Sequence, residues 1–187
     1  MAHSLHSQFV YGFLENETDF ERAWHFQADR SQGRRIPRNC IEPKHLQYGR
    51  MACFGEQIER LFQLFPTEQI KVLVHDDLKD VPRKMYREVL QFLDIADDGR
   101  KEFGRVNANK VHRFPRLAEF AMHPPFPLNA VKATTKTMLG RSHFSMSRKL
   151  YMSLTKCPSR KPLREEFRQQ LMAFYHDDIR KLEQLLN

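Results

Sequence analysis

The sequence predicts an α/β protein that is mostly helical and has one clear parallel strand. Apolar residues recur at three- and four-residue steps over three segments, which is the spacing of amphipathic helices. One short β-branched run, Ile70–Val74, has the composition of a buried strand. Because this run stands between two of the helical segments, the order is half of an α/β layer. The 187 residues allow one domain and hardly two.

The first helix is indicated by a capping-box spacing. Thr18 and Glu21 stand three positions apart, so each side chain can bind the backbone amide of the other, which predicts a helix from Thr18 to about Asp29. Glycine, prolines and basic residues follow over 30–43, and this composition predicts an exposed basic loop.

The next segments alternate in type. An amphipathic helix is expected from about Leu46 and should end before Pro66. The strand Ile70–Val74 follows, and another helix should begin at Val81-Pro82, because proline is tolerated in a first turn. A strand needs a neighbour for its backbone groups, and the sequence offers only weak partners for Ile70–Val74. We therefore expect an incomplete layer.

The last third begins irregularly and ends in a helix. Prolines and basic residues dominate beyond Ala96, where only short helices are expected, near Leu117 and Phe144. From Leu163 onward, apolar residues keep helical spacing over more than five turns, which predicts a long C-terminal helix.

The net charge of +8 lies in two blocks. Residues 33–50 hold five basic residues and one acidic residue, and residues 98–163 hold 14 basic and 3 acidic residues. Such blocks suit an anionic partner, whether a phosphorylated cofactor, a nucleic acid or an acidic membrane surface. The alternative is a solvated basic face with no specific partner.

Several classes of protein and site are not indicated. The chain has no apolar run long enough to span a bilayer and no signal-peptide pattern, so we expect a cytoplasmic protein. Neither common glycine-rich phosphate loop occurs, and no histidine spacing indicates a metal site, so none is expected. Asp76-Asp77 could be catalytic after a strand, but turn and cap residues are the simpler interpretation. Three cysteines are expected to be reduced: Cys40, Cys53 and Cys157.

A family resemblance emerges from five short motifs that follow one another in order. They are Tyr48-Gly49, Phe65-Pro66-Thr67-Glu68-Gln69-Ile70, Asp76-Asp77-Leu78, Asp80-Val81-Pro82 and Phe92-Leu93-Asp94-Ile95. The set resembles the later half of sulfotransferase domains that use 3′-phosphoadenosine 5′-phosphosulfate (PAPS). Flanking matches extend the resemblance over nearly the whole chain, at Ala2–His6, Val106–Asn109, Pro115-Arg116, Lys161–Leu163 and Tyr175–Glu183.

The resemblance implies a P-loop-NTPase-like three-layer fold. Residues 1–187 would form the C-terminal part of that domain, because the family's phosphosulfate-binding loop would lie before residue 1. The intact enzyme transfers a sulfuryl group from PAPS, its co-substrate, to a hydroxyl or amine of a carbohydrate or small molecule. We expect this chain to be truncated and inactive alone, and no residue is assigned as catalytic.

The resemblance also implies three cofactor-binding residues. Ser4 occupies the serine position of a motif that contacts the 3′-phosphate of the nucleotide. Lys110 and Arg113 are similar to the cations of a loop that closes over the nucleotide, with a gap that differs by one residue. Simpler interpretations are also open: Ser4 could be an ordinary serine near the N-terminus, and Lys110 and Arg113 could be solvated cations of a loop.

The competing hypothesis is a non-enzymatic basic helical module that binds nucleic acid or another polyanion. Six aromatic residues stand among the basic residues of 98–163, as in single-strand binders, although aromatics at such spacing are more often core. They are Phe103, Phe114, Phe120, Phe126, Phe144 and Tyr151.

Overall fold

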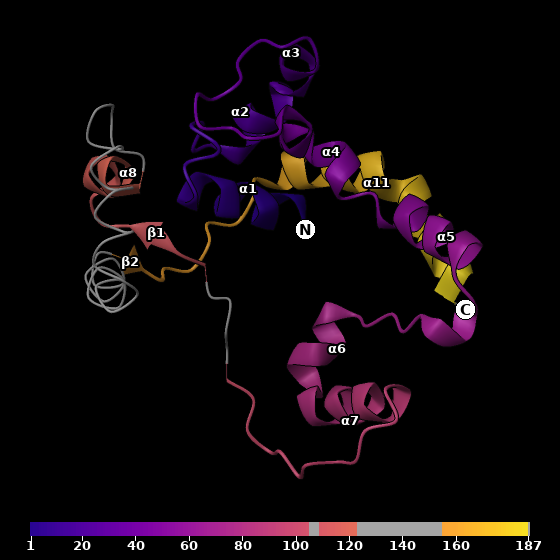
Figure 1. Ribbon diagram of the computed structural model, residues 1–187. Helices are drawn as coiled ribbons and strands as arrows, with labels where there is room; N and C mark the ends of the chain where they lie inside the picture. Colours follow the sequence, from indigo (N-terminus) through magenta and orange to yellow (C-terminus); the bar gives the residue numbers. More distant parts are fainter. Residues whose placement is uncertain (105–108, 123–154, 187) are drawn as a thin grey trace, which may run out of the picture. The chain divides into compact units, whose positions relative to one another are not determined.

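The computed structural model describes residues 1–104, 109–122 and 155–186, and it divides into two compact units. The first unit consists of Met1–Ala52 and Ala108–Gln170, and the second of Cys53–Asn107 and Leu171–Asn187. The described residues are mostly helical and contain one small antiparallel sheet of two strands (Figure 1). No parallel strand occurs among them, so the α/β prediction is confirmed only in its helical content.

The first unit is built around its N-terminal helix. Helix α1 packs against α2 and α4, and α3 packs against the short 3-10 helix η1 (Figure 1). The helices of this unit are α1 (Ala2–Tyr11), α2 (Phe20–His25), α3 (Gln27–Ser31), η1 (Pro43–Leu46), α4 (Tyr48–Met51), α8 (Pro115–Met122) and the first turns of α11 (Glu165–Leu186).

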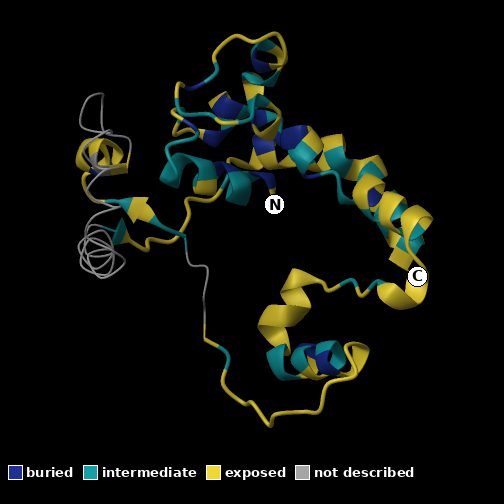
Figure 2. Ribbon diagram, viewed as in Figure 1, coloured by how far each residue is buried: buried dark blue, intermediate teal, exposed yellow. Residues whose placement is uncertain are grey.

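Aromatic residues form the core of the first unit. Tyr48, Phe167 and Leu46 are fully buried, and Figure 2 shows the buried residues gathered in the helices around them. The Phe20 ring meets Tyr48 and Phe167 edge to face, with centroids 5.8 and 5.7 Å apart. Each such pair adds about 0.5–1.5 kcal/mol beyond the burial of its area. This core joins the start of α11 to the N-terminal helices.

The capping-box prediction has the wrong cap residue. Asp19 is the N-cap of α2, because its carboxylate accepts a hydrogen bond of 2.9 Å from the Arg22 amide. Its side chain reaches the third amide of the helix, as Thr18 would have done one residue earlier. Helix α2 then ends at His25, and α3 begins at Gln27 in place of one continuous helix.

The two strands lie beside the C-terminal end of α1. Strand β1 (Val111–His112) pairs with β2 (Thr155–Lys156), so that Val111 is opposite Lys156. The His112 ring stacks between Tyr11 and Phe13, with centroids 4.4 and 4.8 Å away. His112 Nε2 also lies 2.8 Å from the Tyr11 carbonyl oxygen. These contacts attach the sheet to α1.

The second unit consists of helices joined by extended chain. They are α5 (Phe54–Leu64), the 3-10 helix η2 (Thr67–Gln69), α6 (His75–Asp80), α7 (Pro82–Phe92) and the later turns of α11. The amphipathic helix expected from Leu46 is divided into α4 and α5, but it ends before Pro66 as predicted. The predicted helix start at Pro82 and the long C-terminal helix are also confirmed.

The prediction of a strand at Ile70–Val74 is wrong. Its backbone is extended at both ends, with φ −119° and ψ 119° at Ile70 and φ −85° and ψ 126° at Val74. No strand in the described part of the chain pairs with it. Extended conformation alone does not make a strand, because the ladder needs a second row of amide groups. The predicted helix near Leu117 is α8, whereas the one near Phe144 lies outside the described residues.

Candidate functional site

The candidate site lies on the N-terminal half of α1, where Ser4 meets Arg160. Arg160 Nη2 donates a hydrogen bond of 3.3 Å to Ser4 Oγ, and Arg160 Nε donates one of 3.1 Å to Ser7 Oγ. Ser4 and Ser7 are three residues apart on a helix, so their hydroxyls lie on the same face. One guanidinium therefore spans two hydroxyls from a segment 156 residues earlier in the chain.

The Arg160 guanidinium is exposed, whereas both serines are half-buried. Ser7 Oγ donates to the His3 carbonyl oxygen at 2.9 Å, which fixes its position against α1. A guanidinium with further N–H groups open to solvent can bind a phosphate or carboxylate through two parallel hydrogen bonds. The arrangement therefore has the chemistry of an anion-binding site.

His3 borders this site without adding charge at neutral pH. Its ring stacks on Phe20 at 5.0 Å between centroids, and burial lowers its pKa to about 4, with a smaller contribution from Arg160. His6, one turn further, also has a lowered pKa because it is buried. Of these side chains, Arg160 therefore carries the positive charge at pH 7.

Lys110 and Arg113 lie in the same unit but toward the other end of α1. They flank β1, whose His112 contacts Tyr11 at the end of the helix. Seven residues separate Ser4 from Tyr11, about 10 Å along an α-helix. Lys110 is half-buried and Arg113 is exposed, and within the described residues neither contacts Ser4. The structure thus places Ser4, Lys110 and Arg113 in the same unit, but Lys110 and Arg113 lie apart from Ser4.

A hydrogen bond from a side chain to the backbone connects the two segments that carry these cations. The Asn109 side-chain amide donates a hydrogen bond of 3.2 Å to the Pro158 carbonyl oxygen. Together with the β1–β2 pairing, this contact holds residues 109–113 beside residues 155–158. Arg160 follows two residues later, so Lys110 and Arg160 belong to neighbouring stretches of chain.

Sequence reasoning missed Arg160. The residue stands directly before Lys161-Pro162-Leu163, one of the stretches that carry the family resemblance. Arg160 and Lys161 are adjacent basic residues, but nothing in the sequence shows that Arg160 lies against Ser4 in the folded chain. Only the tertiary contact identifies it.

The first unit also holds a buried ionic network. Arg30 donates to Glu15 through two nitrogens, at 2.7 and 2.8 Å, and neither side chain is exposed. The Tyr48 hydroxyl donates a hydrogen bond of 2.7 Å to Glu15 Oε2, and burial together with that carboxylate raises the pKa of Tyr48. The residues are closed to solvent, so the network supports α1 and α4 and is not open to a ligand.

The second unit offers no comparable site at Asp76-Asp77. Both residues lie in the first turn of α6, and Lys79 Nζ is 2.9 Å from Asp76 Oδ1. That hydrogen bond lowers the pKa of Asp76, which is exposed. The arrangement is the one expected for turn and cap residues.

Metal-binding groups and membrane-spanning helices are absent from the described residues. Residues 1–104, 109–122 and 155–186 contain no group of three or more histidine, cysteine or carboxylate side chains placed to hold a metal ion. Over the same ranges, no helix is both long and apolar enough to cross a membrane. No disulfide joins Cys40, Cys53 and Cys157.

Comparison with known proteins gave no match to any family model, curated protein or solved structure. The assignment of function therefore depends on the motifs of the sequence and the geometry of the site.

Proposed function

We propose that this chain is the C-terminal part of a PAPS-dependent sulfotransferase domain. The intact domain would transfer a sulfuryl group from PAPS to a hydroxyl or amine of a carbohydrate or small molecule. The observation that carries this proposal is the contact between Arg160 and Ser4. Ser4 was assigned to the 3′-phosphate by its motif, and an exposed guanidinium lies against it.

The chemistry of the contact supports a phosphate ligand. Arginine binds phosphate oxygens with paired donors, and the hydroxyl of Ser4 can donate to the same group. The binding should be weak, with a dissociation constant on the order of 1 mM, because one exposed cation offsets little of the cost of association. Lys110 and Arg113 would add screened positive charge near the nucleotide.

The family's three-layer fold belongs to the same proposal. Its support is the order of elements in the second unit, where the extended Ile70–Val74 connects α5 with α6 and α7. The motifs that carry the resemblance fall at the ends of these elements. Phe65-Pro66 ends α5, and Val81-Pro82 begins α7.

The mechanism expected for sulfuryl transfer makes few demands on covalent chemistry. The reaction needs an acceptor in line with the leaving oxygen and positive charge that stabilises the developing negative charge. In our proposal Ser4 and Arg160 hold the nucleotide by its 3′-phosphate, remote from the transferred group, and Ser7 orients the Arg160 guanidinium. They position the co-substrate and transfer no proton.

Calorimetry with two nucleotides tests the proposal. 3′-Phosphoadenosine 5′-phosphate should bind at least about threefold more tightly than adenosine 5′-phosphate, since one hydrogen bond contributes about 0.5–1.5 kcal/mol. Equal affinities would contradict the assignment of the 3′-phosphate. If single-stranded oligonucleotide bound far more tightly than either, the alternative of a basic module for polyanions would replace it.

A further inference from the structure

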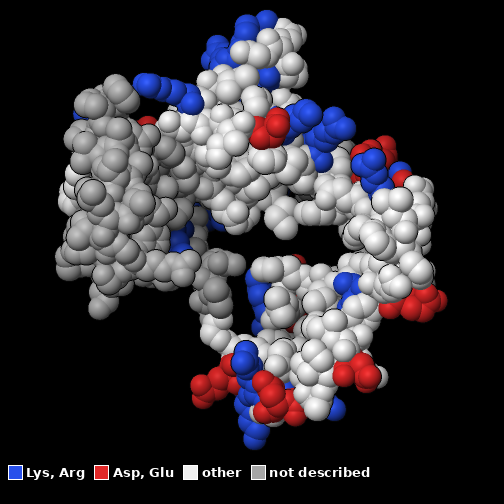
Figure 3. All heavy atoms as spheres, viewed as in Figure 1, with Lys and Arg blue, Asp and Glu red and all other residues white. Residues whose placement is uncertain are grey.

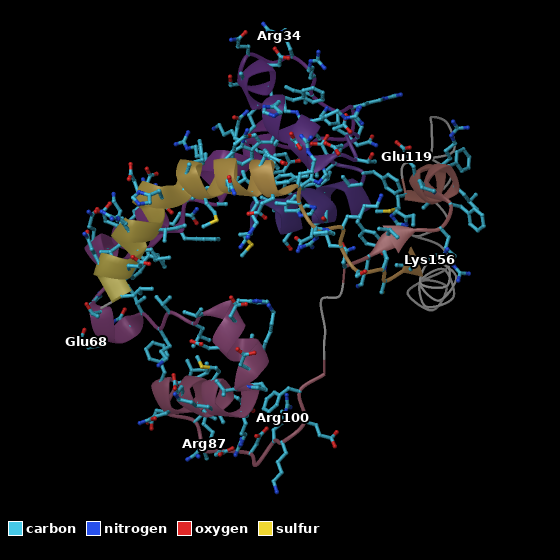
Figure 4. All side chains as sticks on the ribbon, turned by 180° about the vertical axis from the view of Figure 1, so that it is seen from behind. Arg34, Glu68, Arg87, Arg100, Glu119 and Lys156 are labelled. Atoms are coloured by element: carbon cyan, nitrogen blue, oxygen red, sulfur yellow. The ribbon has the colours of Figure 1, made fainter. Side chains whose placement is uncertain are left out.

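A second set of exposed cations on the first unit is carried by a segment other than those assigned to the nucleotide. We define the basic loop as residues 33–50, which run from the end of α3 to the third residue of α4. Figure 3 shows Lys and Arg side chains gathered over α3 and the chain that follows it, and Arg34 stands at the outer end (Figure 4). Its five basic residues are all exposed: Arg34, Arg35, Arg38, Lys44 and Arg50.

The basic loop is held in place from beneath by the buried network. Arg30, which is paired with Glu15, donates from Nε to the Arg35 carbonyl oxygen at 3.3 Å. The Arg34 amide donates to the Asp29 carbonyl oxygen at 2.9 Å, and Gly33 turns the chain there with φ of 78°. These contacts fix the backbone around Arg34 and Arg35, which lowers the entropy cost of binding at the start of the loop.

Only part of the positive charge is neutralised within the protein. Asp29 pairs with both Arg34 and Arg35, at 2.6 and 2.8 Å. In the part of the chain that the structure describes, Arg38, Lys44 and Arg50 form no ion pair. Their ammonium and guanidinium groups face water, so they remain available to an anionic partner.

The aromatic residues of this segment argue against a single-stranded nucleic acid as the partner. Proteins that bind single-stranded nucleic acid stack bases on exposed aromatic rings. Tyr48, the only Phe, Tyr or Trp residue of the basic loop, is fully buried, and the nearby Phe26 ring lies under the Arg35 guanidinium, 4.4 Å from its centroid. A polymer that carries sulfate or carboxylate groups needs cations and no stacking surface.

We propose that the basic loop binds an anionic polysaccharide that carries sulfate or carboxylate groups. The claim that this polysaccharide accepts the sulfuryl group rests on the proposed function. The claim that the basic loop binds it does not depend on that function. The loop would recognise the spacing of charges along the polymer through Arg38, Lys44 and Arg50.

Heparin is the probe for the test, and single-stranded poly(dT) is the comparison. The variant R38A/K44A/R50A should bind heparin about tenfold or more weakly at 0.1 M salt, since all three cations would contact it. The control K84A/K101A/R180A loses the same charge from exposed residues of the second unit and should change the affinity less than about twofold.

Three results would overturn the proposal. Equal losses in the two triple variants would show a diffuse charge effect, and tighter binding of poly(dT) through the same three residues would show a nucleic-acid surface. R160A separates this test from that of the proposed function, because it should weaken nucleotide binding and leave heparin binding unchanged. Loss of heparin binding in R160A would likewise contradict a separate surface.

Discussion

Arg30 and Glu15 form an ion pair of 2.7 Å with both side chains completely excluded from solvent. Burying two charges costs several kcal/mol per ion, and the cost is offset only where hydrogen bonds satisfy the remaining groups. Here Glu15 also accepts hydrogen bonds from the Tyr48 hydroxyl and the Glu17 amide, at 2.7 and 2.9 Å. The pair therefore connects the turn after α1 with α3 and α4.

Replacing one partner of this pair should strongly destabilise the first unit. Glu15→Ala leaves the Arg30 charge buried and unpaired, and we expect a loss of about 3–5 kcal/mol. Urea denaturation followed by fluorescence measures it, because the single tryptophan, Trp24, packs against Phe167 in the core of this unit.

The double variant Glu15→Leu/Arg30→Met is the control for that loss. With both charges removed, it should be less destabilised than Glu15→Ala alone, since apolar residues of similar volume often replace buried ion pairs. A double variant at least as unstable as the single one would mean that the charges are not coupled.

Asp178 should stabilise the start of α5 in the second unit. Its carboxylate accepts hydrogen bonds from the Gly55 and Glu56 amides, at 3.0 and 3.1 Å. We expect Asp178→Ala to cost about 0.5–2 kcal/mol, as for loss of an N-cap. Amide hydrogen exchange at Gly55 and Glu56 should become faster.

The neighbouring Asp177→Ala is a matched control for that experiment. Its side chain is fully exposed, and among the described residues it pairs only with His176 of the same helix, so exchange at α5 should not change. Equal acceleration by both variants would show a general effect of charge on α11 and would contradict capping by Asp178.

The stability of the first unit should depend on the ionisation of His3. Its folded-state pKa of about 4 lies below the ordinary 6.5, so the unfolded chain binds a proton more readily. Stability should therefore be fully present above about pH 6.5 and fall as the pH decreases toward 4. Urea denaturation across this range should show a shallower decrease for His3→Gln, and an unchanged slope would contradict the assignment.

Binding of a phosphate at Arg160 should raise the pKa of His3. A dianion beside the ring favours its charged form and opposes the effect of the Arg160 charge. NMR titration of the His3 ring with and without 3′-phosphoadenosine 5′-phosphate measures the shift. An unchanged pKa at saturation would place the phosphate elsewhere.

Lys110 and Arg113 should contribute less to nucleotide affinity than Arg160. They flank β1 beside the far end of α1, and their charges are screened. Lys110→Ala and Arg113→Ala should each weaken binding of 3′-phosphoadenosine 5′-phosphate modestly, by up to about threefold. Arg116→Ala, an exposed cation of α8, should leave the affinity unchanged in the same calorimetric titration, and an equal loss there would favour a diffuse basic surface.

Local patterns predicted the helices better than the contacts between distant segments. The starts of α7 at Pro82 and of α11 near Leu163 follow from proline position and apolar spacing, which are local properties. Ile70–Val74 has strand composition, but pairing depends on a partner that the composition of the run does not specify. Asp19 and Thr18 are both good N-caps, so the sequence left the choice between them to tertiary packing.

The candidate site could be predicted only in part for the same reason. Ser4 was found through its motif, whereas Arg160 lies 156 residues away and reaches Ser4 only in the folded chain. Its neighbour Lys161 belongs to a motif, but a basic pair in a loop is usually a solvated surface feature. The sequence does not show that two residues so far apart in the chain lie close together in the fold.

Binding of 3′-phosphoadenosine 5′-phosphate to three variants tests the central claim most directly. Ser4→Ala and Arg160→Ala should each weaken binding roughly three- to tenfold, because each removes a hydrogen-bonding group worth about 0.5–1.5 kcal/mol. Arg168→Ala removes the same charge from an exposed position on α11 of the same unit and should have no effect. If Arg168→Ala weakened binding as much as Arg160→Ala, or if neither site variant changed it, the phosphate would not bind at Ser4 and Arg160, and the sulfotransferase proposal would lose its structural support.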